Sequence, residues 1–128
     1  MFYSKNYNRF CIKSNVTVRA ALKHLDKEKI RTCICCDENG RLVGTFSFGD
    51  FNRWILKVDA TNLENSIVNA MNSDAYFLGE YEEIDNLSEI VRKYKVIPVV
   101  DDQMHVIGAI TDVRKDDKIT IGNYVISN

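Results

Sequence analysis

The stretch of sequence that decides the fold is Ile30-Arg-Thr-Cys-Ile-Cys-Cys-Asp-Glu-Asn-Gly-Arg-Leu-Val-Gly44. Two apolar runs flank a polar Asp/Asn/Gly segment, a pattern that predicts a strand, a turn and a second strand. The same pattern returns in Tyr94-Lys-Val-Ile-Pro-Val-Val-Asp-Asp-Gln-Met-His-Val-Ile-Gly108, where Asp101 matches Asp37 and Gly108 matches Gly44 at an offset of 64 residues. The chain therefore contains two copies of one unit.

Amphipathic patterns surround both hairpins and complete the unit. Apolar residues at helical spacing precede the first hairpin, with Thr17 as the predicted N-cap: Val18, Ala21, Leu22 and Leu25. A second helical stripe precedes the second hairpin: Ile84, Leu87, Val91 and Tyr94. A third stripe follows the first hairpin: Phe51, Trp54, Ile55 and Val58. Because a short strand is predicted ahead of each of the first two helices, over Phe10–Lys13 and Ala75–Gly79, the unit is strand–helix–strand–strand–helix.

The second copy ends differently from the first. After Thr111 the residues Asp-Val-Arg-Lys-Asp-Asp-Lys carry no apolar stripe, so a full last helix is not expected there. Apolar residues then alternate about Gly122-Asn123, which predicts a hairpin. The expected fold class is α/β (α+β). It comprises an N-terminal extension (1–9), a first repeat (10–58), a linker helix (59–74), a second repeat (75–116) and a C-terminal hairpin (117–128).

Composition limits the classes of protein to which the chain can belong. It has 128 residues, of which 45% are hydrophobic and 27% charged, and a net charge of −1. Nucleic-acid-binding domains normally have a basic face, so this balance argues against one. No apolar run reaches the length of about 20 residues that spans a bilayer, and the N-terminus lacks the apolar core of a signal peptide. We expect a cytoplasmic protein that binds neither nucleic acid nor membrane.

Four cysteines raise the question of a disulfide scaffold or a metal site. Without an export signal the thiols are expected to be reduced. Cys33, Cys35 and Cys36 lie close together on one predicted strand, whereas zinc ligands normally come as spaced pairs on turns. The remaining candidates add no ligand spacing: Cys11, His24 and His105. We expect small buried side chains and no metal site.

The segment Gly44-Thr-Phe-Ser-Phe-Gly-Asp50 is the clearest candidate for chemistry, because a strand runs into a helix there. Ser47 is placed to cap the helix, and Asp50 to return a bond to the backbone of the cap, which makes a capping box that needs no ligand. Alternatively, Asp50 faces outward and accepts hydrogen bonds from the two hydroxyls of a ribose, next to helix N–H groups that favour an anion. Spacing alone favours the capping box.

No catalytic set is found in the sequence. It has no Ser/His/Asp arrangement in a recognisable context, no Gly-rich phosphate loop and no paired histidine ligands. His24 falls on the polar side of its helix and His105 at the start of a strand, so both are expected to be structural or solvated. The sequence therefore predicts no enzyme activity and no required cofactor.

Together these features resemble a tandem pair of cystathionine-β-synthase (CBS) domains, also called a Bateman module. The resemblance covers about residues 10–111. It rests on the repeated order, on Pro98-Val-Val-Asp101, on the strands that end at Gly44 and Gly108, and on the Gly-x-x-Ser-x-x-Asp pattern ending at Asp50. The link Ile67-Val-Asn-Ala-Met-Asn72 is also similar to the usual entry into a second CBS domain. The resemblance implies two repeats packed sheet to sheet about a pseudo-twofold axis.

The function that the resemblance implies is a non-catalytic regulatory module with an adenosyl or other nucleotide ligand between its halves. In the family, the Ser/Thr and Asp of one copy hold the ribose, while the other copy lines the base and offers basic side chains to phosphate. Carried onto this sequence, the ligand-binding residues are Thr45, Ser47, Asp50, Phe77, Leu78 and Lys95. Asp50 would bind the ribose hydroxyls with help from Ser47, and Lys95 would approach the phosphates.

The second site departs from the family pattern. Thr111 matches Ser47, but Arg114 stands where an Asp is expected. A guanidinium cannot accept hydrogen bonds from a ribose, although Arg31, the match of Lys95, is suited to hold an anion there. We therefore expect one competent site and one degenerate site.

Two further expectations concern partners. The tail Lys118–Ile126 is similar to the opening hairpin of bacterial sialic acid synthase-type enzymes, which implies a fused catalytic domain of sialic acid or amino-sugar biosynthesis in the parent protein. CBS pairs commonly dimerise through their helices, so we expect a homodimer, with Phe51 and Trp54 either as its anchors or as core residues. Two alternatives are a structural dimerisation module that has lost ligand binding and a free-standing small enzyme, the latter disfavoured by the missing catalytic set.

Overall fold

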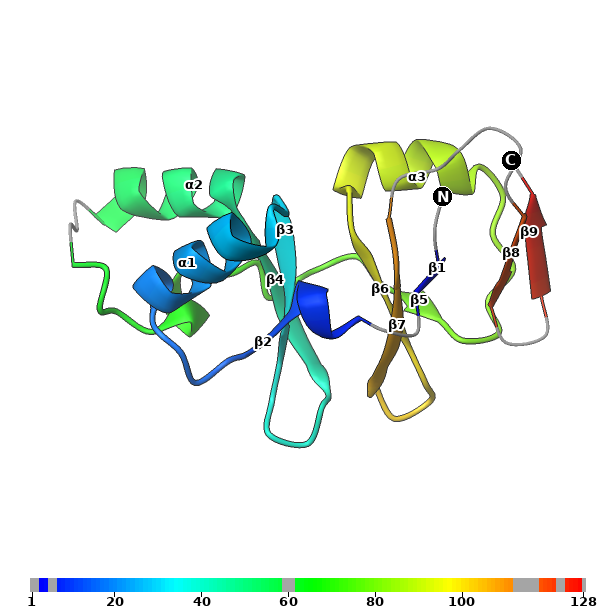
Figure 1. Ribbon diagram of the computed structural model, residues 1–128, viewed down its shortest axis with the longest axis horizontal. Coiled ribbons are helices and arrows are strands. Elements are labelled where there is room, and N and C mark those ends of the chain that lie inside the picture. The colour runs from blue at the N-terminus through cyan, green and yellow to red at the C-terminus, as the bar shows by residue number, and fades with distance from the viewer. Residues whose placement is uncertain (1–2, 5–6, 59–61, 112–117, 122–123, 128) are drawn as a thin grey trace. The chain divides into compact units, whose positions relative to one another are not determined.

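The computed structural model describes residues 3–4, 7–58, 62–111, 118–121 and 124–127, and Figure 1 shows their helices and strands. The chain divides into two compact units. The first unit is formed by residues 8–75, and the second unit by residues 76–128 together with residues 1–7. Each unit has its own sheet and its own hydrophobic core.

The first unit contains a three-stranded sheet in the order β2–β3–β4. Strand β2 (Cys11–Lys13) is parallel to β3 (Thr32–Cys36), and β3 is antiparallel to β4 (Leu42–Ser47). All residues of β3 are buried, as expected for the central strand of a sheet. The predicted hairpin and the strand ahead of it are therefore confirmed.

Two α-helices pack against this sheet. Helix α1 (Val18–Glu28) connects β2 to β3, and helix α2 (Phe48–Val58) follows β4 directly. Thr17 is the N-cap of α1, as predicted, because its Oγ1 accepts a hydrogen bond from the amide of Ala20 at 3.1 Å. Within the expected linker, the described residues contain one 3-10 turn, η2 (Ile67–Asn69).

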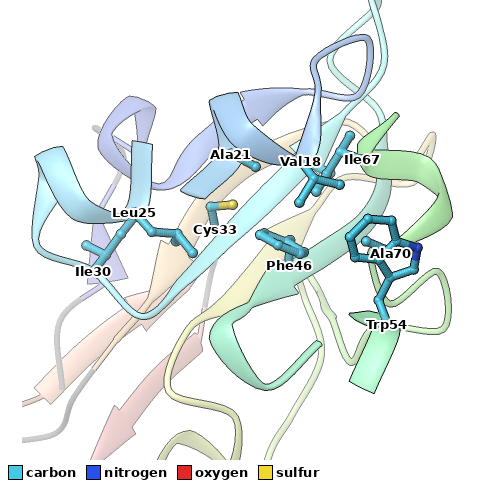
Figure 2. Close-up of a cluster of buried hydrophobic side chains, with 10 residues drawn as sticks. Val18, Ala21, Leu25, Ile30, Cys33, Phe46, Trp54, Ile67 and Ala70 are labelled. Atoms are coloured by element: carbon cyan, nitrogen blue, oxygen red, sulfur yellow. The ribbon is translucent and has the colours of Figure 1, made fainter. Parts of the chain in front are cut away.

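The core of the first unit lies between these helices and one face of the sheet (Figure 2). It is formed by Val18, Ala21, Leu25, Ile30, Cys33, Cys35, Phe46, Trp54, Ile67 and Ala70. Trp54 is only 6% exposed, and Phe51 packs against the same cluster with its ring 6.3 Å from that of Trp54. Trp54 is thus a core residue, the second of the two interpretations given above.

The four-stranded sheet of the second unit repeats this strand order with one extra strand. Strand β5 (Leu78–Gly79) is parallel to β6 (Ile97–Val100), which is antiparallel to β7 (Val106–Ile110). Helix α3 (Leu87–Tyr94) connects β5 to β6. The extra strand is β1 (Tyr3–Ser4), which pairs with the outer edge of β7. The unit's core is formed by Leu78, Leu87, Val91, Ile97, Val99 and Ile110.

Identical hydrogen bonds in the two hairpin turns show the internal repeat at atomic detail. Asp37 Oδ1 accepts from the amides of Asn39 and Arg41, both at 2.9 Å. Asp101 Oδ1 accepts from the amides of Gln103 and His105, at 3.0 and 2.9 Å. Each carboxylate closes its turn by bonding its own backbone, the reason aspartate favours such turns.

The structure differs from the sequence prediction in the second unit. Strand β5 covers only the last residues of the predicted strand Ala75–Gly79. Helix α3 begins at Leu87 rather than Ile84, because Asn86 has a left-handed backbone (φ 60°) and ends the preceding loop. The missing last helix falls on residues 112–117, which lie outside the described residues.

The C-terminal hairpin forms as predicted. Strand β8 (Lys118–Ile121) pairs antiparallel with β9 (Tyr124–Ser127), with Ile121 opposite Tyr124. The predicted turn residues Gly122 and Asn123 lie outside the described residues. Along the part of the chain that the structure describes, no helix is both long and apolar enough to cross a membrane.

Candidate functional site

Helix α2 begins at a reciprocal capping box formed by Ser47 and Asp50. The amide of Asp50 donates to Ser47 Oγ at 3.1 Å, and the amide and hydroxyl of Ser47 both donate to Asp50 Oδ2 at 2.9 Å. These bonds satisfy backbone groups that the first turn of a helix leaves without partners. The capping interpretation is therefore confirmed, and the Asp50 carboxylate is held in one orientation.

The other oxygen of this carboxylate faces Arg53. Arg53 Nη2 donates to Asp50 Oδ1 at 2.8 Å, and the Asp50 side chain is 12% exposed whereas that of Arg53 is 67% exposed. A carboxylate has about four lone-pair sites, so the hydrogen bonds from Ser47 and Arg53 leave one site on Oδ1. The helix cap therefore does not exhaust the acceptor capacity of Asp50.

Asp50 lines a pocket of about 420 Å³ within the first unit. One part of its wall is a stripe of α2 side chains at helical spacing: Asp50, Arg53, Trp54 and Lys57. The rest of its wall is the segment that follows η2: Asn69, Ala70, Met71 and Asn72. Small-molecule sites have volumes of about 300–1,000 Å³, so the pocket is large enough for one.

A close backbone contact holds the second part of the wall against the sheet. The amide of Asn72 donates to the carbonyl oxygen of Thr45 at 2.7 Å, and the amide of Thr45 donates to that of Asn72 at 3.0 Å. A Cβ atom at Gly44 would lie only 2.7 Å from the carbonyl oxygen of Asn72. Glycine is therefore required at position 44, since any side chain would separate the segment from β4.

Comparison with protein-family models now assigns the chain. The model of the CBS domain matches twice, over residues 6–57 and 66–113. The chain belongs to the CBS domain family. It is a tandem CBS pair, and its two matched regions contain the two strand–helix–strand–strand copies described above.

Solved structures of CBS proteins have the same fold. The CBS domain pair of protein MJ0100, in complex with 5′-methylthioadenosine and S-adenosyl-L-methionine, is 29% identical with a TM-score of 0.66, covering 85% of this chain and 87% of that one. Protein MJ1004 from Methanocaldococcus jannaschii is 26% identical with a TM-score of 0.66, covering 85% and 52%. Staphylococcus aureus OpuCA has a TM-score of 0.63 at 24% identity, covering 80% and 84%, a likeness of fold alone.

One curated relative is an enzyme. L-aspartate semialdehyde sulfurtransferase of Methanocaldococcus jannaschii is 33% identical over 100 residues, which are 77% of this chain. The match spans only 19% of the length of that relative. The resemblance of the tail to sialic acid synthase-type enzymes gains no support from the CBS matches, because they end at residue 113.

The site residues predicted in the first CBS repeat lie together around the start of α2. Asp50 lines the pocket, Ser47 fixes Asp50, and Thr45 anchors the segment that contains Asn72. Sequence reasoning missed Arg53, Lys57 and the segment 69–72. The two cations follow Asp50 at the third and seventh positions along the helix, a spacing that could have revealed them on the same face.

The site residues predicted in the second CBS repeat lie in the second unit. Phe77 is 41% exposed and Lys95 is exposed, but the whole of Leu78 is only 1% exposed, because it belongs to the core of the second unit. The Lys95 backbone adopts a positive-φ γ-turn (φ 69°, ψ −48°), in which the amide of Val96 donates to the carbonyl of Tyr94 at 2.8 Å. That Phe77, Leu78 and Lys95 form one ligand site with Asp50 stays a prediction.

The residues of the predicted degenerate site are only partly described. Arg31 is exposed just before β3, and Thr111 is half-buried just after β7. Arg114 lies outside the described residues. The degeneracy of this site therefore stays a prediction from the sequence.

The four cysteines are free thiols, and two of them have a raised pKa. Cys33, Cys35 and Cys36 are buried and Cys11 is half-buried. A hydrogen bond with Cys36 and burial raise the pKa of Cys11 far above its ordinary value, and a bond with Cys33 and burial do the same for Cys35. Protonated thiols are poor nucleophiles and metal ligands. Within the described residues, no three His, Cys, Asp or Glu side chains are grouped to hold a metal ion.

Both histidines have structural partners, as expected. His24 Nε2 lies 2.8 Å from the carbonyl oxygen of Arg9, and His105 Nδ1 lies 3.2 Å from Asp101 Oδ2. Desolvation by itself would raise the pKa of Asp101, but hydrogen bonds from the amides of His105 and Gln103 outweigh it and hold that pKa below its ordinary value. Asp101 therefore acts as the anchor of a turn.

Proposed function

We propose that this CBS pair is a regulatory module that binds an adenosyl or other nucleotide ligand and catalyses no reaction itself. The observation that carries the proposal is the position of Asp50, a fixed carboxylate with a free acceptor site on the wall of a pocket of about 420 Å³. The related CBS pair of protein MJ0100 was solved with two adenosyl ligands, which supports this ligand class.

In the proposed complex the ribose hydroxyls donate to Oδ1 of Asp50. The bonds from Ser47 to Oδ2 keep the carboxylate in position, so little freedom is lost when the ligand binds. In this proposal the second CBS repeat contributes the exposed Phe77 beside the base and the exposed Lys95 near the phosphates, whereas Leu78 is buried and takes no direct part.

Regulation follows from linkage. A ligand changes the activity of an attached or associated enzyme only if it binds one arrangement of the module more tightly than another. Couplings of about 1–3 kcal/mol are typical, and they change affinity or activity severalfold or more.

The test is calorimetric titration of the full chain with adenosine, AMP, ATP, 5′-methylthioadenosine and S-adenosylmethionine. We expect one ligand per chain, and a thermal midpoint that rises with ligand concentration because binding stabilises the folded state. Asp50→Asn should weaken nucleoside binding about tenfold or more, since a charged acceptor is lost. The Asn side-chain oxygen can still accept from Ser47, so the helix cap is retained.

Asp26→Asn on α1 is the matched control, because Asp26 is exposed and its only ion pair in the described structure is a distant one with Lys29 at 3.9 Å. Circular dichroism should show that both variants keep the wild-type helix content. If Asp50→Asn bound nucleoside as well as the wild type, the ribose assignment would be wrong. Two equal sites per chain would contradict the predicted degeneracy at Arg114.

A structural dimerisation module is the second candidate function. It is favoured by the ion pair of Arg53 with Asp50, which already occupies part of the acceptor capacity, and by Leu56 on α2, which is 83% exposed. A stable dimer by light scattering, with no stabilisation by any ligand of the panel, would support it over the regulatory proposal. Homodimer formation otherwise stays a prediction.

We further propose that the module is fused to the enzyme that it controls. A CBS pair that matches 19% of an enzyme's length is of a size to be one segment of a larger protein. The assignment to sialic acid or amino-sugar biosynthesis rests on residues 118–126 alone, the region of the β8–β9 hairpin. A reading frame that continues past Asn128 into a barrel domain would support it, and a stop codon there would contradict it.

A further inference from the structure

The charges around the Asp50 pocket are unequal. Arg53 and Lys57 are one helical turn apart on α2, and both line the pocket with Asp50. These two cations and one carboxylate are the only ionisable side chains in the described lining, which leaves one excess positive charge. Both cations come from the same repeat as the carboxylate, so the imbalance belongs to the first unit itself.

Both cations have exposed side chains. Arg53 bonds Asp50, whose side chain is only 12% exposed, but the Arg53 side chain is itself 67% exposed and can turn toward solvent. Lys57 is exposed and has no ion-pair partner among the described residues. Lys57 is therefore available to an anion at once, and Arg53 becomes available when ribose hydroxyls replace it at Asp50.

Asp50, Arg53 and Lys57 follow one another along α2 in the order in which a nucleotide presents its ribose and its phosphates. At 1.5 Å per residue, Arg53 lies about 4–5 Å beyond Asp50 along the axis of α2 and Lys57 about 10 Å beyond it. A ribose held by Asp50 would place a 5′-phosphate chain along this stripe, first beside the guanidinium and then beside the ammonium group. Guanidinium groups bind phosphate through two parallel hydrogen bonds, and a Lys ammonium binds it as a point charge.

We propose that the pocket selects phosphorylated nucleosides, with Arg53 and Lys57 as the residues of the first repeat that bind the phosphates. The proposal rests on the proposed function, because it requires the ribose at Asp50. When the ribose hydroxyls engage Oδ1, Arg53 turns from Asp50 to the first phosphate, and Lys57 meets the next one. S-adenosylmethionine has a net charge of about +1 and a sulfonium at the position of the first phosphate, so this wall favours it less than a nucleotide.

The experiment compares adenosine, AMP, ADP and S-adenosylmethionine by calorimetry on the full chain and on Arg53→Gln and Lys57→Gln. The wild type should bind ADP about tenfold or more tightly than adenosine, with the advantage shrinking as salt is raised. Arg53→Gln should weaken AMP and ADP, and Lys57→Gln should weaken ADP most. Lys57→Gln should leave the affinity for adenosine unchanged, because adenosine carries no phosphate.

Lys27→Gln is the matched control, because Lys27 lies in the last turn of α1 just as Lys57 lies in the last turn of α2. Cations favour that position through the helix dipole alone, and the control measures that contribution. Equal affinities for adenosine and ADP, or an ADP affinity that Lys57→Gln does not change beyond the effect of Lys27→Gln, would overturn the phosphate assignment.

The two proposals fail in different ways. Adenosine binding that depends on Asp50 but gains nothing from phosphates would leave the nucleoside site standing and refute only the role of Arg53 and Lys57. Absence of binding by every nucleoside, or adenosine binding insensitive to Asp50→Asn, would refute the proposed function and the phosphate assignment together.

Discussion

At the scale of single residues, the two hairpin turns differ in one position. Gly40 has a φ of 82° in the first repeat, and Met104 has a φ of 68° at the equivalent position of the second. The amides of both residues donate to the carbonyl oxygen of the turn aspartate at 3.1 Å, so the turn geometry is the same. Only glycine adopts this left-handed region without steric cost.

We therefore expect Met104→Gly to stabilise the protein by about 0.5–1 kcal/mol. Met104 is only half-buried, so little packing is lost with its side chain. The measurement is urea unfolding of the variant and the wild type. Gly40→Ala is the reciprocal change and should destabilise by about 1 kcal/mol. A loss of stability in Met104→Gly would show that the methionine side chain outweighs the backbone strain.

Asp101 gives the second repeat a defined response to acid. Its pKa is lower in the folded protein than in the unfolded chain, so the folded state binds the proton less tightly. The ionised Asp101 therefore adds to the free energy of unfolding at pH values above the pKa of the unfolded chain. This stabilisation is lost as the pH falls through the lower pKa of the folded protein. Asp101→Asn keeps an acceptor for both amides but cannot titrate.

We expect urea unfolding between pH 7 and pH 2.5 to show a smaller acid-induced loss of stability in Asp101→Asn than in the wild type, mainly below about pH 4. Asp102→Asn is the neighbouring control, since Asp102 is exposed and has no partner among the described residues. An acid response that both variants share with the wild type would show that other carboxylates determine it.

At the scale of elements, the segment 69–72 depends on the absence of a side chain at Gly44. Gly44→Ala places a Cβ against the carbonyl oxygen of Asn72, so we expect a loss of about 1–3 kcal/mol and weaker nucleoside binding, because one wall of the pocket moves away from α2. Thermal unfolding and calorimetry measure the two effects.

Gly49→Ala is the control, and we expect it to raise the stability of the protein whereas Gly44→Ala lowers it. Its nearest neighbours are the flexible end of Arg53 at 3.4 Å and Ser47 Oγ at 3.5 Å, and alanine is favoured inside a helix by up to about 1 kcal/mol. If both alanine variants lost stability equally, the close approach at Gly44 would not explain the effect.

Local chemistry made much of the fold predictable. The turn aspartates, the Thr17 cap and the Ser47–Asp50 box each act within four residues of themselves, so spacing in the sequence was enough to find them. Strand β1 was not predictable, because Tyr3–Ser4 carries no strand signal and its partner β7 is distant in the chain. The predicted start of α3 at Ile84 was wrong. Apolar residues at helical spacing extend back to Ile84, but the left-handed backbone of Asn86 prevents the helix from beginning before Leu87.

At the scale of the whole molecule, the sequence identified one anchor of the site and missed its surroundings. Asp50 was predicted because it belongs both to the Gly-x-x-Ser-x-x-Asp pattern of the family and to the capping box with Ser47. The wall formed by segment 69–72 depends on a backbone pairing with Thr45, and no local pattern predicts such a contact. Arg53 and Lys57 resembled ordinary solvated charges of a helix until the pocket placed them beside Asp50.

The pairing of β1 with β7 determines when the second unit can be completed during synthesis. Residues 8–75 form the first unit from a continuous stretch, so it can fold on the ribosome as soon as that stretch emerges. Tyr3 must wait for Ile110, its partner in the sheet, until both repeats have been translated. Tyr3 and Ser4 thus leave the ribosome before the first repeat but find their neighbours after it, and the first repeat folds as an insertion within the second.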